Sequence, residues 1–476
     1  MVEAHSGALA GDDATWEALC EAHGLLRVRD LDEMADTLEL LAAGRRVRRR
    51  PPSDRASGSG GGARTAGSAG DTGASAPSPV RGGIASVHDS GAERALVADV
   101  AHEVGVPFAS IADATKQALA VLLDPGLEPG NPLDVWGRGS QTKELFGACL
   151  LALAKDDAVD VVALCVDLIP ELDNDTAYPE ALVDAWASTA KPLCLVSNIA
   201  SALDRPAARR LRDAGIPVLE GTRTGLLALG HLLELASNAE RRPPAPVEID
   251  SDRRDRWLER LSRGRLAGAE SLALLADYGL AVPSHLAVGS AEVAIEAAES
   301  IGWPVVLKTD EPGIAHKSDV GGVILGLGSP AALESAYEDL ASRLGPRALV
   351  MATAAPGPEL ALGMVRDALL GPVVVVGAGG VLVEVLADRS VALPPVDLAS
   401  ARRLLDRLAV RHVLDGARGG TRSDVEAVAA AIVALSLLSV ELGEAITAVD
   451  VNPLRCGPAG ALALDALIVL EDQKIT

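Results

Sequence analysis

The 476-residue sequence is poor in aromatic side chains, with five Trp, three Tyr and two Phe residues. Because 49% of its residues are nevertheless hydrophobic, the cores are expected to be built from Ala, Val, Leu and Ile. The five cysteines are far apart and lack the Cys-x-x-Cys spacing that is typical of metal and redox sites. They are predicted to be small core residues of a protein in a reducing compartment, which indicates a cytoplasmic location.

Positive charge and long apolar runs are also scarce. Lys and Arg number 43 against 66 Asp and Glu, which gives a net charge of −23. This balance argues against non-specific binding of nucleic acid, which needs a cationic surface. The longest uncharged stretch, 368–383, has 16 residues and contains a proline. A membrane span needs ~20 consecutive apolar residues, so none is expected. The first residues also lack the basic and apolar segments of a signal peptide.

Composition divides the chain at two places. Residues 49–83 are dense in Gly, Ser, Ala and Pro and carry almost no large apolar side chain, so they predict a flexible linker. Residues 241–256 combine prolines with a run of charges and predict a second linker. The piece before the first linker is expected to form one long helix and a second short one within 12–43, which is little for an autonomous domain.

The two longer pieces differ in pattern. In 84–240, short apolar runs alternate with amphipathic stretches, which is typical of an α/β fold with a parallel sheet covered on both faces. Residues 257–476 instead contain two helices, a series of strands with glycine-rich turns, a helical region and a last hairpin, which indicates an α+β arrangement. The strands expected in the first of these pieces are 160–168, 191–198 and 216–221.

Lysine is rare in this sequence, so the position of each lysine is informative. Lys308 and Lys317 flank a turn that leads into Gly321 and Gly322. A lysine at a strand end beside a glycine-rich hairpin suits a polyphosphate, because its point charge acts together with backbone N–H groups that can approach closely. The alternative is a pair of surface lysines on a hairpin.

The last hairpin predicts a metal site. Asp450 and Asn452 are two residues apart and therefore lie on one face of a strand. If 457–460 forms the turn, Asn452 lies opposite Asp465, although Pro453 interrupts the ladder between them. Carboxylate and amide oxygens on one face are the ligands that Mg²⁺ needs when it binds with a nucleotide. The alternative is a set of polar residues that closes a turn.

Two histidines are candidates for phosphate chemistry. His5 lies among small residues, before a helix expected to begin at Asp12 or Asp13. The N–H groups and positive dipole end of a helix N-terminus favour a phosphate group that is bound or attached nearby. His316 is of interest because it lies between Lys308 and Lys317. A histidine so close to the start of the sequence as His5 can also be without function.

Taken together, these residues resemble the NDP-forming acyl-CoA synthetases, the family of ADP-forming acetate–CoA ligases related to succinyl-CoA synthetase. The opening AHSGALAG resembles the family's phosphohistidine loop, usually written SHTGALAG. Residues 84–240, with the NPLD stretch at 131–134, resemble its second flavodoxin-like ligase subdomain. Residues 257–476 resemble its ATP-grasp domain. The HKSDVGG and DVNPL strings, in this order, are the features that make this match specific to the family.

The resemblance implies an activity and a role for each site residue. The family interconverts a carboxylic acid, CoA and ATP with acyl-CoA, ADP and phosphate, through an acyl phosphate and a phosphohistidine. His5 matches the phosphorylated histidine, and His316 matches a second histidine that some members use as a relay. The nucleotide would be bound by Lys308, the glycines Gly321 and Gly322, a hinge formed by Val350, Met351 and Ala352, and Glu359. Mg²⁺ would be bound by Asn452 and Asp465.

The resemblance also implies how the chain is divided. Residues 1–48 would be the C-terminal remnant of the first flavodoxin-like subdomain, and the family's N-terminal CoA-binding domain is not found in the sequence. A separate CoA-binding subunit and assembly into an oligomer are therefore expected. Two alternatives remain. The chain is an ATP-binding regulatory or interaction subunit that lacks full activity, or it is an ATP-grasp ligase that joins a carboxylate to an amine. The ligase-like subdomain disfavours the latter.

Overall fold

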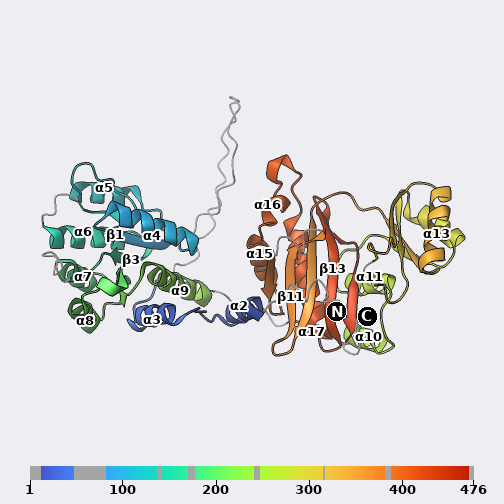
Figure 1. Cartoon of the computed structure of the whole chain (residues 1–476), viewed down its shortest axis with the longest axis horizontal. Helices are drawn as coiled ribbons and strands as arrows, with labels where there is room; N and C mark the ends of the chain where they lie inside the picture. The colour runs from blue at the N-terminus through green and yellow to red at the C-terminus, as the bar shows by residue number, and fades with distance from the viewer. Residues whose placement is uncertain are drawn as a thin grey trace, which may run out of the picture. The chain divides into compact units, whose positions relative to one another are not determined.

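The computed structural model describes residues 12–47, 82–136, 141–169, 177–240, 247–314, 317–380 and 388–470. The chain forms two compact units. Leu26–Arg242 form one, called here the parallel-sheet unit, while Met1–Leu25 and Pro243–Thr476 together form the other, called the antiparallel-sheet unit (Figure 1). The predicted site residues His5 and His316 lie outside the described residues.

The parallel-sheet unit has five strands in the order β2-β1-β3-β4-β5, all parallel. This order is typical of flavodoxin-like folds and confirms the α/β prediction. Its strands are β1 (Gly83–His88), β2 (Leu133–Asp134), β3 (Val159–Cys165), β4 (Leu193–Val196) and β5 (Val218–Leu219). Its helices are α3 (Leu31–Ala42), α4 (Gly91–Glu103), α5 (Asp113–Leu122), α6 (Thr142–Lys155), α7 (Ala177–Ser188), α8 (Arg205–Asp213) and α9 (Thr222–Glu240), with a 3₁₀ turn at Ala200–Ala202.

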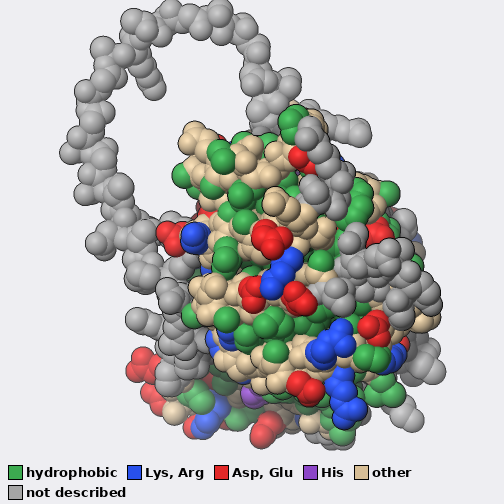
Figure 2. Space-filling view, turned by 90° about the vertical axis from the view of Figure 1, so that its left-hand side faces the viewer, with side chains coloured by type: hydrophobic (Ala, Val, Ile, Leu, Met, Phe, Trp, Pro, Cys, Tyr) green, Lys and Arg blue, Asp and Glu red, His purple; other side chains and the backbone are tan. Residues whose placement is uncertain are grey.

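Helices cover both faces of this sheet. Residues of α5, α6, α7 and α8 share one hydrophobic cluster with the strands, and residues of α3, α4 and α9 share another. Because water reaches neither face, the strands are apolar runs without alternation, as in β3, where VDVVALC is buried at all positions but one. On the unit's surface, acidic and basic side chains are interspersed (Figure 2). Lys143 of α6, for example, pairs with Glu180 and Asp184 of α7.

The antiparallel-sheet unit has two sheets, which confirms the α+β prediction. The smaller has the order β6-β9-β7-β8, and the larger has the order β12-β11-β10-β13-β14, with β15 also paired to β13. The strands are β6 (His285–Val288), β7 (Val305–Thr309), β8 (Val323–Leu327), β9 (Ala348–Ala352), β10 (Glu359–Asp367), β11 (Gly371–Ala378), β12 (Arg389–Ala392), β13 (Ile446–Gly457), β14 (Gly460–Ala463) and β15 (Leu467–Leu470). The helices are α2 (Asp12–His23), α10 (Ser251–Leu261), α11 (Gly268–Asp277), α12 (Ala291–Ile301), α13 (Pro330–Leu344), α15 (Leu398–Asp406), α16 (Arg411–Leu414) and α17 (Val425–Leu442), with a 3₁₀ turn at Ala417–Gly419.

Helix α17 lies against one face of the larger sheet (Figure 1). It is the one helix in the described part of the chain that is long and apolar enough to cross a membrane. Most of its side chains are buried, however, in the core that it forms with β10, β11 and β13. This burial identifies α17 as a core helix. Its sequence does not form a long uncharged run, because Glu426 and Glu441 lie within the helix.

Helix α2 covers part of the opposite face. Side chains alternate across β10 and β11, so Leu360 and Val374 point to the α17 side while Ala361 and Val373 point to the other. Ala18 of α2 packs on this second face. The carboxylate of Glu21 on α2 also pairs with two arginines of the α15 region. The N–O distances are 2.7 Å to Arg407 and 3.8 Å to Arg403.

The prediction for 12–43 was wrong in its helix lengths. Helices α2 and α3 have 12 residues each and are separated by an irregular segment. They also belong to different units, so the structure divides the segment 1–48, which was predicted as one piece. The physical reason is that each helix buries a different face. Ala18 of α2 packs on β11 and β12, whereas Leu40 of α3 packs against α9.

The predicted second linker ends earlier than expected. Residues 251–256 belong to α10, and the side chain of Asp250 caps its N-terminus by accepting from the Arg253 N–H. The charges of 251–256 therefore belong to the first turns of this helix. One of its arginines, Arg253, pairs with the buried carboxylate of Glu441 on α17 at 2.6 Å, which fixes α10 to the core.

The register predicted for the last hairpin is confirmed. Residues 454–457 of β13 pair with β14. Residues 446–450, on the other side of a break at Pro453, pair with β15. Both partners keep the same register, so Asn452 and Asp465 face each other at the break. The pairs on either side of the break are Leu454 with Ala463 and Asp450 with Leu467.

Candidate functional site

A cleft of about 740 Å³ lies within the antiparallel-sheet unit. Strands β7, β8 and β9 of the smaller sheet contribute one part of its lining, and the β13–β15 hairpin contributes another. The cleft brings together most of the predicted nucleotide and metal residues. Those that line it are Lys308, Met351, Ala352, Glu359, Asn452 and Asp465.

Lys308 is the most buried cation of the cleft. It lies near the end of β7 with 7% of its surface exposed, and its Nζ donates to the carbonyl oxygen of Leu464 at 2.7 Å. Burial lowers the pKa of Lys308, an effect opposed by the carboxylate of Asp465 and reinforced by the ammonium of Lys317. An ammonium group held in this way retains two further N–H donors, which suits it to phosphate oxygens.

Lys317 follows in the segment that connects β7 to β8. Its Nζ lies 2.6 Å from Oδ1 of Asp465, and the exposed fractions of the two side chains are 11% and 26%. The same Oδ1 accepts the backbone N–H of Ala466 at 2.9 Å. In this structure the Asp465 carboxylate is therefore neutralised by a lysine of the opposite wall.

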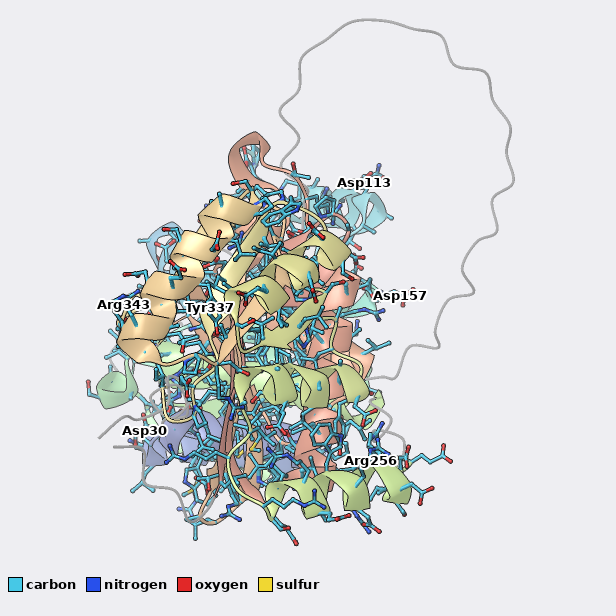
Figure 3. The ribbon with its side chains drawn as sticks, turned by 90° about the vertical axis from the view of Figure 1, so that its right-hand side faces the viewer. Asp30, Asp113, Asp157, Arg256, Tyr337 and Arg343 are labelled. Carbon is cyan, nitrogen blue, oxygen red and sulfur yellow. The ribbon has the colours of Figure 1, made fainter. Side chains whose placement is uncertain are left out.

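The predicted glycines shape this segment rather than line the cleft. Gly322 donates its N–H to the carbonyl oxygen of Lys317 at 2.7 Å, and a Cβ at Gly322 would lie 2.8 Å from that same oxygen. Gly321 has a φ of +65°, which favours glycine. From α13, where Figure 3 labels it, Arg343 donates to the carbonyl oxygens of Val320 and Gly321. These contacts fix the turn that returns the chain into β8.

Strand β9 was predicted as the hinge that contacts adenine. Met351 and Ala352 line the cleft, but the Val350 side chain points to the other side of the sheet and is fully buried in the core of α12 and α13. Side chains alternate along a strand, so those of Val350 and Met351 point to opposite faces, while Ala352 is the last residue of β9. A contact between Val350 and a nucleotide would have to come from its backbone.

Glu359 lies at the start of β10, opposite Arg455 of β13. Its Oε1 accepts from the guanidinium of Arg455 at 2.5 Å. Gly380 approaches so closely that a Cβ there would meet Oε2 of Glu359. The carboxylate of Glu359, which lines the cleft, is therefore fixed between the guanidinium of Arg455 and the backbone of Gly380.

The oxygen donors at the break in the hairpin fit a hydrated divalent cation. Oδ1 of Asn452 accepts the Gly380 N–H at 3.1 Å and leaves its second lone pair free for another partner. Across the break lies the Asp465 carboxylate. Within the described ranges, no three His, Cys, Asp or Glu side chains come together as a metal-binding group. Mg²⁺ does not require one, because it is usually held by one or two carboxylates with water and phosphate oxygens.

Besides Lys317, six further charged residues line the cleft that were not given a role in the prediction: Arg265, Asp310, Glu311, Asp319, Asp450 and Arg455. Asp310 caps α11 by accepting the N–H groups of Gly268 and Ala269, and burial raises the pKa of its carboxyl. A signal for two of them existed in the sequence, since Asp310 is two residues from Lys308 and Asp450 two from Asn452. The two arginines gave no such signal.

Comparison with protein families matches two parts of the chain. Residues 258–470 match an ATP-grasp domain, and residues 1–41 match a succinyl-CoA ligase-like flavodoxin domain. The acetate–CoA ligase (ADP-forming) II subunit beta of Pyrococcus furiosus is 34% identical over 226 residues, which are 45% of this chain and 95% of that protein. The acetate–CoA ligase (ADP-forming) I of Archaeoglobus fulgidus is 28% identical in an alignment of 482 positions that covers 98% of this chain and 64% of that protein.

This chain thus spans slightly less than two thirds of the relative that it matches from end to end. Among solved structures, a chain of the dinucleotide-forming acetyl-coenzyme A synthetase 1 of Ca. Korarchaeum cryptofilum, in complex with coenzyme A and Ca-AMPCP, is similar. It is 34% identical and is covered to 99%, against 46% of this chain, with a TM-score of 0.44.

Proposed function

The chain belongs to the family of ADP-forming acetate–CoA ligases, and from this premise we propose that it is an NDP-forming acyl-CoA synthetase. The reaction would interconvert a carboxylic acid, CoA and ATP with acyl-CoA, ADP and phosphate. The supporting observation is the cleft, in which the buried ammonium of Lys308 lies with the oxygen donors Asn452 and Asp465. This is the arrangement that a Mg²⁺-bound polyphosphate requires.

We propose that the cleft carries out the nucleotide half of the reaction. A phosphoryl group on His5 would pass to the β-phosphate of ADP: the N–P bond breaks, a new P–O bond forms, and the imidazole is released. Lys308 would neutralise charge on the phosphates and hold them in position for this transfer. Asn452 and Asp465 would hold Mg²⁺, which screens the negative charge of the phosphates when it is bound. His316 is proposed as a relay near this site.

The packing of α2 supports a carrier role for His5. The helix that follows His5 in sequence packs on the larger sheet of the antiparallel-sheet unit and is held there by Ala18 and Glu21. In one relative of known structure, the phosphohistidine segment points towards the nucleotide-binding site. We propose that the segment around His5 reaches the nucleotide in the same way.

We further propose that CoA and the acid are bound together with a partner subunit, in the cytoplasm, where both substrates and ATP are available. Two relatives that match 45% and 43% of this chain are themselves beta subunits. The complete CoA-dependent reaction is proposed for the assembly with this partner.

Labelling with ATP tests the proposal directly. Incubation with Mg²⁺ and ATP labelled at the γ-phosphate should give a phosphoprotein that is labile in acid and stable in base, as phosphohistidine is. Addition of ADP should remove the label as ATP. His316→Asn removes the proposed relay, so that any label lies on His5. The double variant His5→Asn, His316→Asn should remain unlabelled, while His102→Asn, a matched change on α4, should be labelled normally. Label that persists in the double variant would refute the assignment of His5.

A further inference from the structure

The ion pair between Lys317 and Asp465 involves the carboxylate that would hold the metal. Its N–O distance is 2.6 Å, and both side chains are shielded from water to a large degree. A pair in such a position is screened less by salt and solvent than a pair at the surface. Lys317 and the Ala466 N–H both occupy Oδ1 of Asp465, so a metal that uses this oxygen, or both oxygens of the carboxylate, must displace Lys317.

The structure shows which part of Lys317 is fixed and which part can move. Its carbonyl oxygen is bonded to the N–H of Gly322, and the carbonyl of Gly322 in turn accepts from Thr309 at the end of β7. The backbone is therefore tied to the smaller sheet. The side chain contacts Asp465 across the cleft, on the hairpin, and its flexible methylene chain allows Nζ to change partner without any movement of β7.

The charges around this pair make displacement unfavourable in the absence of an anion. Lys308, Lys317 and Asp465 interact with one another, and Asp310 lies beside Lys317 on the other side. Replacing the ammonium by Mg²⁺ adds two positive charges at Asp465 while the ammonium of Lys317 remains in the cleft beside Lys308. A polyphosphate brings negative charge that offsets this gain.

We propose that Lys317 makes metal binding at Asp465 conditional on the nucleotide. Without nucleotide, the ammonium occupies the carboxylate and excludes the metal; with ADP or ATP, the phosphates stabilise both the metal on Asp465 and the released ammonium. This inference rests on the proposed function, in which Asn452 and Asp465 hold the metal. It assigns to Lys317 a positioning role that the family resemblance did not supply.

The test is the thermodynamic coupling between metal and nucleotide. Mn²⁺ is titrated into the full chain with and without ADP, and free Mn²⁺ is followed by electron paramagnetic resonance. In the wild type, Mn²⁺ alone should bind weakly and ADP should strengthen its binding greatly. In Lys317→Met, Mn²⁺ alone should bind about tenfold more tightly and the coupling factor should fall by at least roughly tenfold, a size typical of coupling between sites.

Two controls separate this role from a general effect of charge. Lys308→Met removes an equal charge from the same cleft but leaves the Lys317–Asp465 pair, so binding of Mn²⁺ alone should change far less. Asp465→Asn in the Lys317→Met background should abolish the gain in Mn²⁺ affinity. Circular dichroism and thermal unfolding verify that each variant is folded, and Lys317→Gln replaces Lys317→Met if the latter is not.

Two results would overturn the inference: tight binding of Mn²⁺ by the wild type without ADP, or an unchanged coupling factor in both Lys317 variants. Neither result would by itself contradict the proposed function. That proposal fails on a different outcome, the absence of any ADP binding in the presence of metal.

Discussion

At the scale of single residues, Lys308 shows how burial prepares a group for a ligand. Its ammonium has one protein acceptor, the carbonyl oxygen of Leu464, and burial lowers its pKa. A phosphate ligand would supply the missing partners and favour the charged form. The cost of keeping this group away from water is thus offset when the nucleotide binds.

We predict that Lys308→Met largely abolishes the stabilisation by nucleotide. Mg-ADP binds only the native state of the wild type, so it should raise the thermal midpoint, by a free energy of ~2.7 kcal/mol when ADP is at 100 times its dissociation constant. Without the ammonium, that increase should disappear. Lys116→Met, an exposed lysine of α5, is the matched control and should behave as the wild type. Differential scanning fluorimetry measures both, and a normal shift in Lys308→Met would contradict the assignment.

His88, at the end of β1, should give the parallel-sheet unit a characteristic dependence on pH. Burial, with a contribution from Arg94, lowers the pKa of His88 from 6.5 to about 4. Between these values the unfolded chain binds a proton that the native state does not, so stability decreases as the pH falls through this window. The buried carboxyl of Asp89, whose pKa is raised by burial, acts in the opposite direction, in a pH window that begins near 3.8 and extends upwards.

We therefore predict a difference between the wild type and His88→Gln that depends on pH. As the pH falls from 7 to 4, the wild type should lose roughly 2–3 kcal/mol of unfolding free energy that the variant retains. Urea unfolding of the parallel-sheet unit at a series of pH values measures this difference. Parallel curves for the two proteins would show that His88 does not titrate in this way.

At the scale of elements, the docking of α2 is the contact that most needs a test. Ala18 is buried in a small apolar cluster with β10, β11 and β12, and Glu21 pairs with Arg407. The helix has only 12 residues, too few to be stable alone in water, so its order depends on this packing.

We predict that Ala18→Asp releases α2 from the sheet, because the substitution buries a carboxylate without a partner. Amide hydrogen exchange within Asp12–His23 should accelerate by about tenfold or more, while β10 and β13 keep their protection. Ala22→Asp introduces the same side chain at an exposed position of α2 and should change exchange little. Mass spectrometry of peptic peptides resolves the two cases. Unchanged exchange in Ala18→Asp would mean that Ala18 does not hold the helix.

The elements also show where sequence reasoning succeeds and where it stops. The hairpin register followed from one turn and the alternation of a strand, because both are local, so Asn452 was correctly placed opposite Asp465. The fate of residues 12–43 depended on which distant surface each helix covers, and no local pattern contains that information. The Lys317–Asp465 pair joins residues that are 148 positions apart, and only the folded structure brings them together.

At the scale of the whole molecule, the chain passes between two units twice, at Leu25 and again at Arg242. The parallel α/β character of one and the α+β character of the other could be predicted from the pattern of apolar runs, since strands buried on both faces look different from strands that alternate. The strand orders came only from the structure. The boundary within the first 48 residues could not be assigned, because α2 contributes to the core of a unit whose remaining sequence begins more than 200 residues later.

The central claim concerns one of these units: its cleft binds a magnesium-bound adenine nucleotide. Isothermal titration calorimetry of the full chain with ADP, in the presence and absence of Mg²⁺, tests it most directly. We predict a single binding event that depends on Mg²⁺ and that is lost in Asp465→Asn. A flat titration in the presence of Mg²⁺, with protein shown to be folded, would contradict the account.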